Sequence, residues 1–159
     1  MNRNKITEIN DEFITAIDRY LNQIGITDIS VNDTVFARDN LSVTSLTRIA
    51  SEREIDSMIA NNKLRYEDMD SINIINDDGT GRIGITTYIV IDSGNNSSTQ
   101  KSLSENSWMH LILKNYLRNT KLSDNIITYS VDEDTPRNHP FSSQNTSSIF
   151  TITSIYSVD

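Results

Sequence analysis

The sequence contains no cysteine, only two histidines and two prolines, and five glycines among its 159 residues. Without cysteine there is no disulfide, no thiolate metal ligand and no thiol nucleophile. A zinc site is nearly excluded as well, since zinc usually takes several Cys or His ligands, and His110 and His139 fall in a predicted helix and a predicted loop. No Gly-Lys-Ser/Thr motif is present, and Gly79, Gly81 and Gly84 lie between two predicted strands, not before a helix that could cradle a pyrophosphate.

Positive charge and long apolar runs are scarce too. The chain has 22 acidic and 14 basic residues, a formal charge of -8, which argues against a duplex-DNA or anionic-membrane surface. No apolar run approaches the roughly 18 residues that span a bilayer, and residues 1–5 do not form a basic-then-apolar leader. We therefore expect a soluble, non-secreted protein with no membrane partner and no sequence-specific nucleic-acid partner.

Two amphipathic helices are predicted with clear ends. The first spans residues 5–23 and stops before Gly25, which suits a left-handed residue after a helix. The second spans Ser104–Lys121, with Ser104 as N-cap and Leu103 and Trp108 forming a hydrophobic staple. The buried stripe of the second helix is predicted to be Met109, Ile112, Leu113, Tyr116 and Leu117.

The remaining pattern predicts a sheet and a helical middle. In residues 69–92, alternating apolar and polar residues lie on either side of an Asn-Asp-Asp-Gly turn, and this pattern predicts a long hairpin. Strands are predicted over 125–131 and 148–158, and residues 26–35 are either a short strand or an ordered loop. Residues 41–62 show helical spacing, with a capping box at Ser51 and Glu54. The chain, 1–159, is thus predicted to be a single α+β domain: a mainly antiparallel sheet with a long β-hairpin and helices packed on it.

Two polar segments interrupt this pattern and are candidate contact elements. Residues 93–102 are expected to form a mobile loop, and residues 132–145, which hold both prolines, a projecting arm. An aromatic and an arginine on an ordered, exposed segment are residue types that anchor interfaces. The interface hypothesis covers Pro136, Arg137, His139, Pro140, Phe141, Asn95 and Asn96. The alternatives are solvated loops of no consequence, or a contact face on the first helix at residues 8–19.

No catalytic constellation stands out from the residues. A serine nucleophile would need a histidine base, and neither histidine has a motif around it. A magnesium-dependent phosphodiesterase, or a regulatory binding protein, could be built from carboxylates alone, with Asp92 beside Asp77, Asp78 or the cluster at 132–134. We expect no enzymatic activity, no cofactor and no bound metal, and keep the carboxylate alternative open.

The order helix, helical middle, long hairpin, helix, strand, strand resembles the small ring-forming proteins of tailed bacteriophages, most of all the tail terminator and neck proteins. In this resemblance the hairpin is 72–91, the helix packed on the sheet is 104–122, and the remaining strands are 126–131 and 149–158. It implies a non-enzymatic subunit of a cyclic homo-oligomer that contacts neighbouring tail or neck proteins. It also implies a protein made in the host cytoplasm and carried in the virion.

Overall fold

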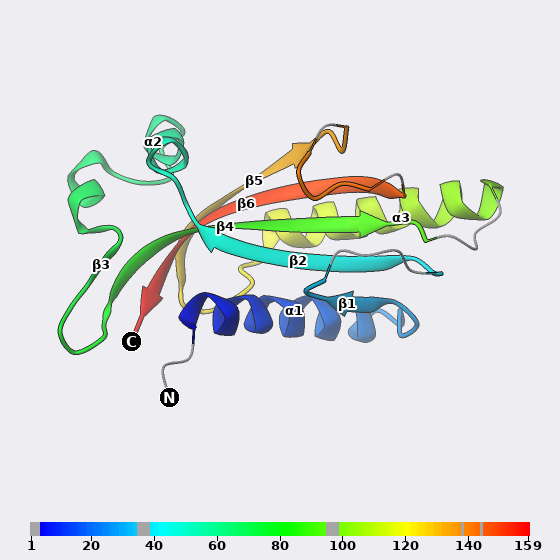
Figure 1. Ribbon diagram of the computed structural model, residues 1–159, viewed down its shortest axis with the longest axis horizontal. Coiled ribbons are helices and arrows are strands. Elements are labelled where there is room, and N and C mark those ends of the chain that lie inside the picture. Colours follow the sequence, from blue (N-terminus) through cyan, green and yellow to red (C-terminus); the bar gives the residue numbers. More distant parts are fainter. Residues whose placement is uncertain (1–3, 35–38, 95–98, 138, 144) are drawn as a thin grey trace.

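The structure, a computed structural model, describes residues 4–34, 39–94, 99–137, 139–143 and 145–159. It contains one six-stranded sheet, with α1 and α3 on one face and α2 on the other (Figure 1). The elements are α1 (Lys5–Gln23), β1 (Ser30–Asn32), β2 (Ser42–Ile49), α2 (Glu52–Ala60), the 3-10 helix η1 (Tyr66–Ser71), β3 (Ile74–Ile75), β4 (Gly81–Asp92), α3 (Thr99–Asn119), β5 (Ile126–Asp134) and β6 (Thr146–Val158). The predicted α+β class, with a mainly antiparallel sheet, is confirmed.

The strands run in the order β1-β2-β4-β6-β5, and β3 pairs with β4 beside this path. Every neighbouring pair is antiparallel except β1 and β2, which are parallel. β4 and β6 are the longest strands and pair along their whole length. The predicted core sheet of hairpin and C-terminal strands is therefore present, and β2 and β1 extend it.

The main core lies between the sheet and the pair α1 and α3. Ile9, Phe13, Ile17 and Leu21 recur at four-residue steps along α1, and all are buried against the sheet. Asn4 caps the start of α1 by accepting the N–H of Ile6. The predicted first helix is confirmed, including its end, since Gly25 takes a φ of 89° that favours glycine.

α3 has the predicted buried stripe but begins earlier than predicted. Met109, Leu113 and Leu117 face the core. The helix starts at Thr99, so Leu103 lies inside it, and both Leu103 and Trp108 are exposed. The predicted N-cap and staple are therefore wrong, because the polar residues before Ser104 continue the helix and leave both side chains on its outer surface.

The predicted helical middle, residues 41–62, is a strand followed by a short helix. Residues 42–49 form β2, because they pair with β1 on one edge and β4 on the other. The helix-like spacing of Leu46 and Ile49 is outweighed by these ladders and by Asn10 of α1, whose side chain bonds the main chain of Ser45 and the hydroxyl of Thr47. Beyond β2 the capping box at Ser51 and Glu54 is confirmed, and it starts α2.

The hairpin exists, but its first arm is short. Residues 66–71 form a 3-10 helix, and β3 contains only Ile74 and Ile75. Ile72 is buried instead under α2, in a small second core with Met58 and Ile155 on the opposite face of the sheet. The hairpin turn and η1 lie at one end of the molecule's long axis, and the start of α3 lies at the other end (Figure 1).

Candidate functional site and contact surfaces

The face of the sheet opposite α1 and α3 is polar along its middle. Alternate residues of β4, β5 and β6 present Tyr88, Asp132 and Thr151 there, between α2 and the segment 135–143. A hollow of about 240 Å³ lies on this face. It is lined by Glu54, Ser57, Met58, Tyr88, Ser130, Asp132, Asp134, His139, Thr151 and Thr153. The hollow is mostly acidic and hydroxylic, with one histidine at its edge.

A network of one arginine, one carboxylate and one phenol holds α2 over this face. Arg48 donates to both oxygens of Glu54, at 2.7 and 3.0 Å, and to the hydroxyl oxygen of Tyr88 at 2.7 Å. Burial raises the pKa of Glu54, but hydrogen bonds from Arg48 and Ser51 outweigh it and lower that pKa to about 2. Glu54 is therefore an anchoring group and not a general acid or base.

The segment predicted as a projecting arm lies against the sheet instead. Residues 132–134 belong to β5, and the chain then folds back so that the rings of His139 and Phe141 each lie 5.1 Å from the ring of Tyr88. Asp134 accepts a hydrogen bond from Thr151 and lies 3.7 Å from the imidazole Nε2 of His139. The segment does not project because its aromatic residues find a partner on the sheet face.

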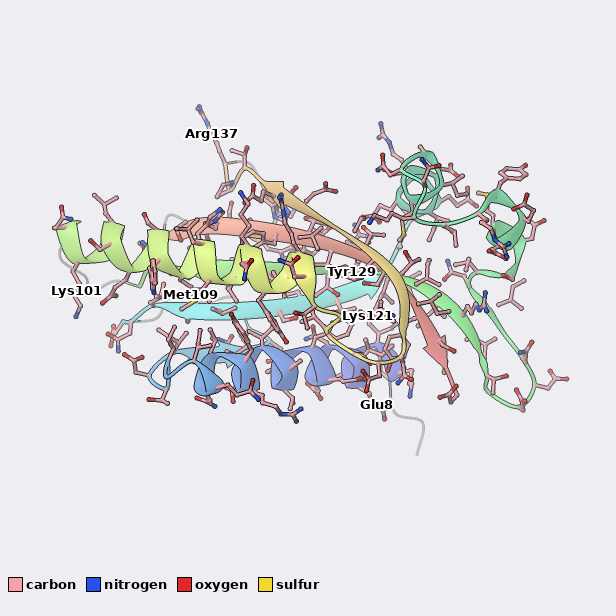
Figure 2. The ribbon with its side chains drawn as sticks, turned by 180° about the vertical axis from the view of Figure 1, so that it is seen from behind. Glu8, Lys101, Met109, Lys121, Tyr129 and Arg137 are labelled. Carbon is pink, nitrogen blue, oxygen red and sulfur yellow. The ribbon has the colours of Figure 1, made fainter. Side chains whose placement is uncertain are left out.

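The predicted contact residues are therefore divided. His139 and Phe141 are partly buried against the sheet. Pro136 is also partly buried, whereas Pro140 is exposed and Arg137 points away from the molecule (Figure 2). Asn95 and Asn96 lie outside the described residues. The predicted loop is also shorter than expected, since residues 99–102 already belong to α3. The hypothesis that these residues form an interface stays a prediction.

A second polar cluster, which the sequence analysis missed, links α3 to β5 and β6. His110 Nδ1 lies 2.8 Å from Ser148 Oγ, and its Nε2 lies 3.0 Å from Glu133. Lys114 and Arg118 approach the same carboxylate at 3.4 and 3.7 Å. Desolvation opposes ionisation of Glu133, but Lys114 and His110 outweigh it and lower the pKa of Glu133. Only the four-residue spacing of His110, Lys114 and Arg118 on one side of a helix could have indicated this cluster.

Ser148, His110 and Glu133 are linked in the same order as the serine, histidine and acid of a hydrolytic triad, so we asked whether they could act as one. Ser148 lies inside β6 and pairs with Ile91 of β4, and the next residue, Ile149, pairs with β4 on one side and β5 on the other. In such a strand the sheet occupies the backbone N–H groups that an oxyanion would need. Glu133 is also shared with two further cations. The cluster is therefore better explained as a set of contacts that hold α3 on the sheet than as a catalytic nucleophile with its base.

The carboxylate constellation considered above is not assembled. Asp77 and Asp78 lie at the hairpin turn and Asp92 at the other end of β4, so the length of that strand separates them. Asp92 is buried and accepts hydrogen bonds from Gly94 N–H and the hydroxyl of Ser143. Within the described part of the chain, no three His, Asp or Glu side chains gather closely enough to hold a metal ion.

Large apolar side chains are exposed on α3 and on β3. On the outer side of α3, Leu103, Trp108 and Leu111 are 60%, 64% and 55% exposed; we call them the α3 patch. At the hairpin end, the most exposed isoleucines are Ile74 and Ile75, at 54% and 52%; we call them the hairpin patch. The α3 patch was not predicted, because Leu103 and Trp108 had been interpreted as a hydrophobic staple.

In Figure 2 the start of α3 and the β-hairpin lie at opposite ends of the molecule. Lys101 marks the far end of α3, while the hairpin leaves the opposite end of the sheet. In the described ranges no helix is long and apolar enough to cross a membrane. Compared with known proteins, the chain matches no family model, no curated sequence and no solved structure.

Proposed function

We propose that this protein is a structural assembly subunit of a tailed bacteriophage particle, forming a ring in the neck or tail as tail terminator-like proteins do. The observation that carries the proposal is the pair of unlike exposed apolar patches, one on α3 and one on β3. Contiguous exposed apolar side chains mark interaction sites. When two different patches bind each other head to tail, every copy makes the same contact with the next. The copies form a closed ring if the rotation from one copy to the next adds up to a full turn.

The arrangement of layers supports the same proposal. The chain forms one sheet with two long helices on one face and a polar second face. The second face is only partly covered, by α2 and by segment 135–143. It offers Asp132, Tyr88 and Thr151 to a neighbouring layer, and Arg137 is exposed beside it.

The described residues contain no assembled catalytic group, so we assign anchoring roles to the polar clusters around Glu54 and Glu133. Glu54 and Glu133 are both held ionised by arginine or lysine, so neither is poised to move a proton near neutral pH. We therefore propose no enzymatic activity and no cofactor. The partners would be further copies of the chain and the neighbouring neck or tail proteins, in a virion assembled in the host cytoplasm.

The proposal is tested by particle composition and by oligomeric state together. An antibody against the purified protein should label one position, at the neck or at a tail end, on virions of the phage that encodes the chain. Native mass spectrometry and negative-stain electron microscopy of the purified protein should show a single ring size at high concentration. Virions that lack the chain, with a protein that stays monomeric at its highest soluble concentration, would overturn the proposal.

A further inference from the structure

The hollow on the second face of the sheet keeps two carboxylates, Asp132 and Asp134, after its ion pairs are counted. Glu54 adds no net charge, because Arg48 donates to both of its oxygens. The side chain of Asp132 is exposed and forms no hydrogen bond or ion pair with any described residue. The nearest basic residue along the chain, Arg137, points away from the molecule (Figure 2). The hollow is therefore negatively charged.

His139, at the edge of the hollow, does not neutralise Asp134 in the hydrogen-bonding state that the structure shows. The backbone N–H of Phe141 donates to Nδ1 of His139 at 3.2 Å, and this bond requires an unprotonated Nδ1 and so a neutral ring. Nε2 of the same ring lies 3.7 Å from Asp134, which is too long for a hydrogen bond. Thr151 does donate its hydroxyl to Asp134, but a hydroxyl brings no positive charge.

The hollow also contains a buried hydroxyl without a partner, which is an observation independent of the carboxylates. Thr153 of β6 is only 8% exposed, lines the hollow and forms no side-chain hydrogen bond with any described residue. Ser130, which pairs with Thr153 across the β5–β6 ladder, lines the hollow too, and its hydroxyl has no described partner either. Burying an unbonded hydroxyl costs free energy. A ligand that donates to Thr153 would remove that cost.

We propose that this hollow binds the guanidinium or ammonium group of a basic side chain supplied by a partner protein. Such a group donates several N–H bonds and carries the positive charge that Asp132 and Asp134 favour. The volume of about 240 Å³ is below the roughly 300–1,000 Å³ of sites for drug-sized ligands, so the hollow suits a single side chain. A metal ion suits it less, because no three His, Asp or Glu side chains of the described residues gather closely enough.

The inference rests on the proposed function only for the source of the side chain, which would be a neighbouring tail or neck protein. Recognition of the cationic group itself is a property of the isolated chain. It is therefore measured on the purified protein, without virions.

The first experiment uses the acetylated and amidated peptide Gly-Arg-Gly as the probe. The same peptide with citrulline in place of arginine is its uncharged control. Titration into isotope-labelled protein should shift the backbone amides of Ser130, Asp132 and Thr153 saturably with the arginine peptide and hardly at all with the citrulline peptide. Added salt should weaken the binding. Asp132→Asn should weaken it about tenfold, whereas Asp124→Asn, at an exposed carboxylate outside the hollow, should leave it unchanged.

The variant Thr153→Val separates a binding role of this hydroxyl from a structural one. Valine has nearly the shape of threonine but no hydroxyl, so it removes a buried group that makes no bond in the free protein. The urea unfolding midpoint should stay equal to the parent's or rise, while peptide binding weakens about fivefold. A variant that binds like the parent, or that is less stable than the parent, would contradict the role assigned to Thr153.

The remaining outcomes identify the occupant and separate this inference from the proposed function. If the arginine and citrulline peptides act alike, or neither shifts these amides, the inference is overturned. Tighter binding of spermidine, or of Mg²⁺ alone, at the same amides would overturn a protein side chain as the occupant. If the peptide binds as expected but virions lack the chain, recognition of the cationic group holds and the proposed function fails. A ring found in virions, without peptide binding, leaves only the proposed function standing.

Discussion

The ion pair that fixes α2 on the sheet predicts a specific dependence of stability on pH. Glu54 accepts two hydrogen bonds from Arg48, and its pKa falls from an ordinary 4.5 to about 2. A carboxyl with a lowered pKa in the folded state stabilises the fold above its unfolded pKa, and this contribution is lost as pH falls through the folded pKa. The contribution of Glu54 should therefore be complete above about pH 5 and disappear between there and about pH 2.

The size of the effect follows from the same geometry. At about 1.4 kcal/mol per pKa unit, the lowering has an upper bound of about 3.4 kcal/mol. Solvent screens the pair, because the side chains of Arg48 and Glu54 remain 44% and 23% exposed. Partly exposed pairs contribute much less than this bound, so we expect Glu54→Gln to lower the free energy of unfolding by about 1–2 kcal/mol near neutral pH.

Urea unfolding of the parent and of Glu54→Gln across a pH series measures this directly. The difference between them should be largest above about pH 5 and shrink toward zero as pH approaches 2. Glu52→Gln is the matched control, since it removes the same charge from the same helix turn, and Glu52 forms no ion pair with any described residue. A difference that is the same at every pH, or equal in the control, would refute the reasoning.

Three further predictions concern packing and buried polar groups, each measured by urea unfolding. Leu113→Ala should lower the free energy of unfolding by about 2–5 kcal/mol, because Leu113 is fully buried, whereas the exposed Leu111→Ala should change little. Phe141→Ala should cost about 1 kcal/mol through its ring contact with Tyr88, and no cost would mean that segment 135–143 is not packed on the sheet. Asp92→Ala should cost about 1–3 kcal/mol by leaving two donors unbonded, and a neutral result would contradict its buried acceptor role.

Periodicity and end signals were sufficient to predict the long elements. α1 matches its predicted bounds because an unbroken apolar stripe is bordered by a cap residue and Gly25. β4 and β6 were found because period-two alternation of Ile, Val and Phe suits a strand with one face in the core. In each case the local pattern and the tertiary packing favour the same structure.

The secondary-structure prediction was wrong at positions where contacts with distant parts of the chain determine the structure. The apolar residues of 42–49 have a spacing that helices and strands share, and only pairing with β1 and β4 selects the strand. Segment 135–143 has no periodicity, so nothing local reveals that His139 and Phe141 pack on Tyr88. The bonds of His110 to Ser148 and Glu133 likewise join residues far apart in sequence, which no local pattern can indicate.

The position of β6 has a consequence for synthesis. β6 lies between β4 and β5 in the sheet but follows both in the chain. Until residues 146–158 leave the ribosome, β4 and β5 cannot belong to one sheet, and each presents an open edge that can pair with another nascent chain. The interval before β6 emerges is therefore the stage of synthesis at which the edges of β4 and β5 are most exposed to pairing with another chain.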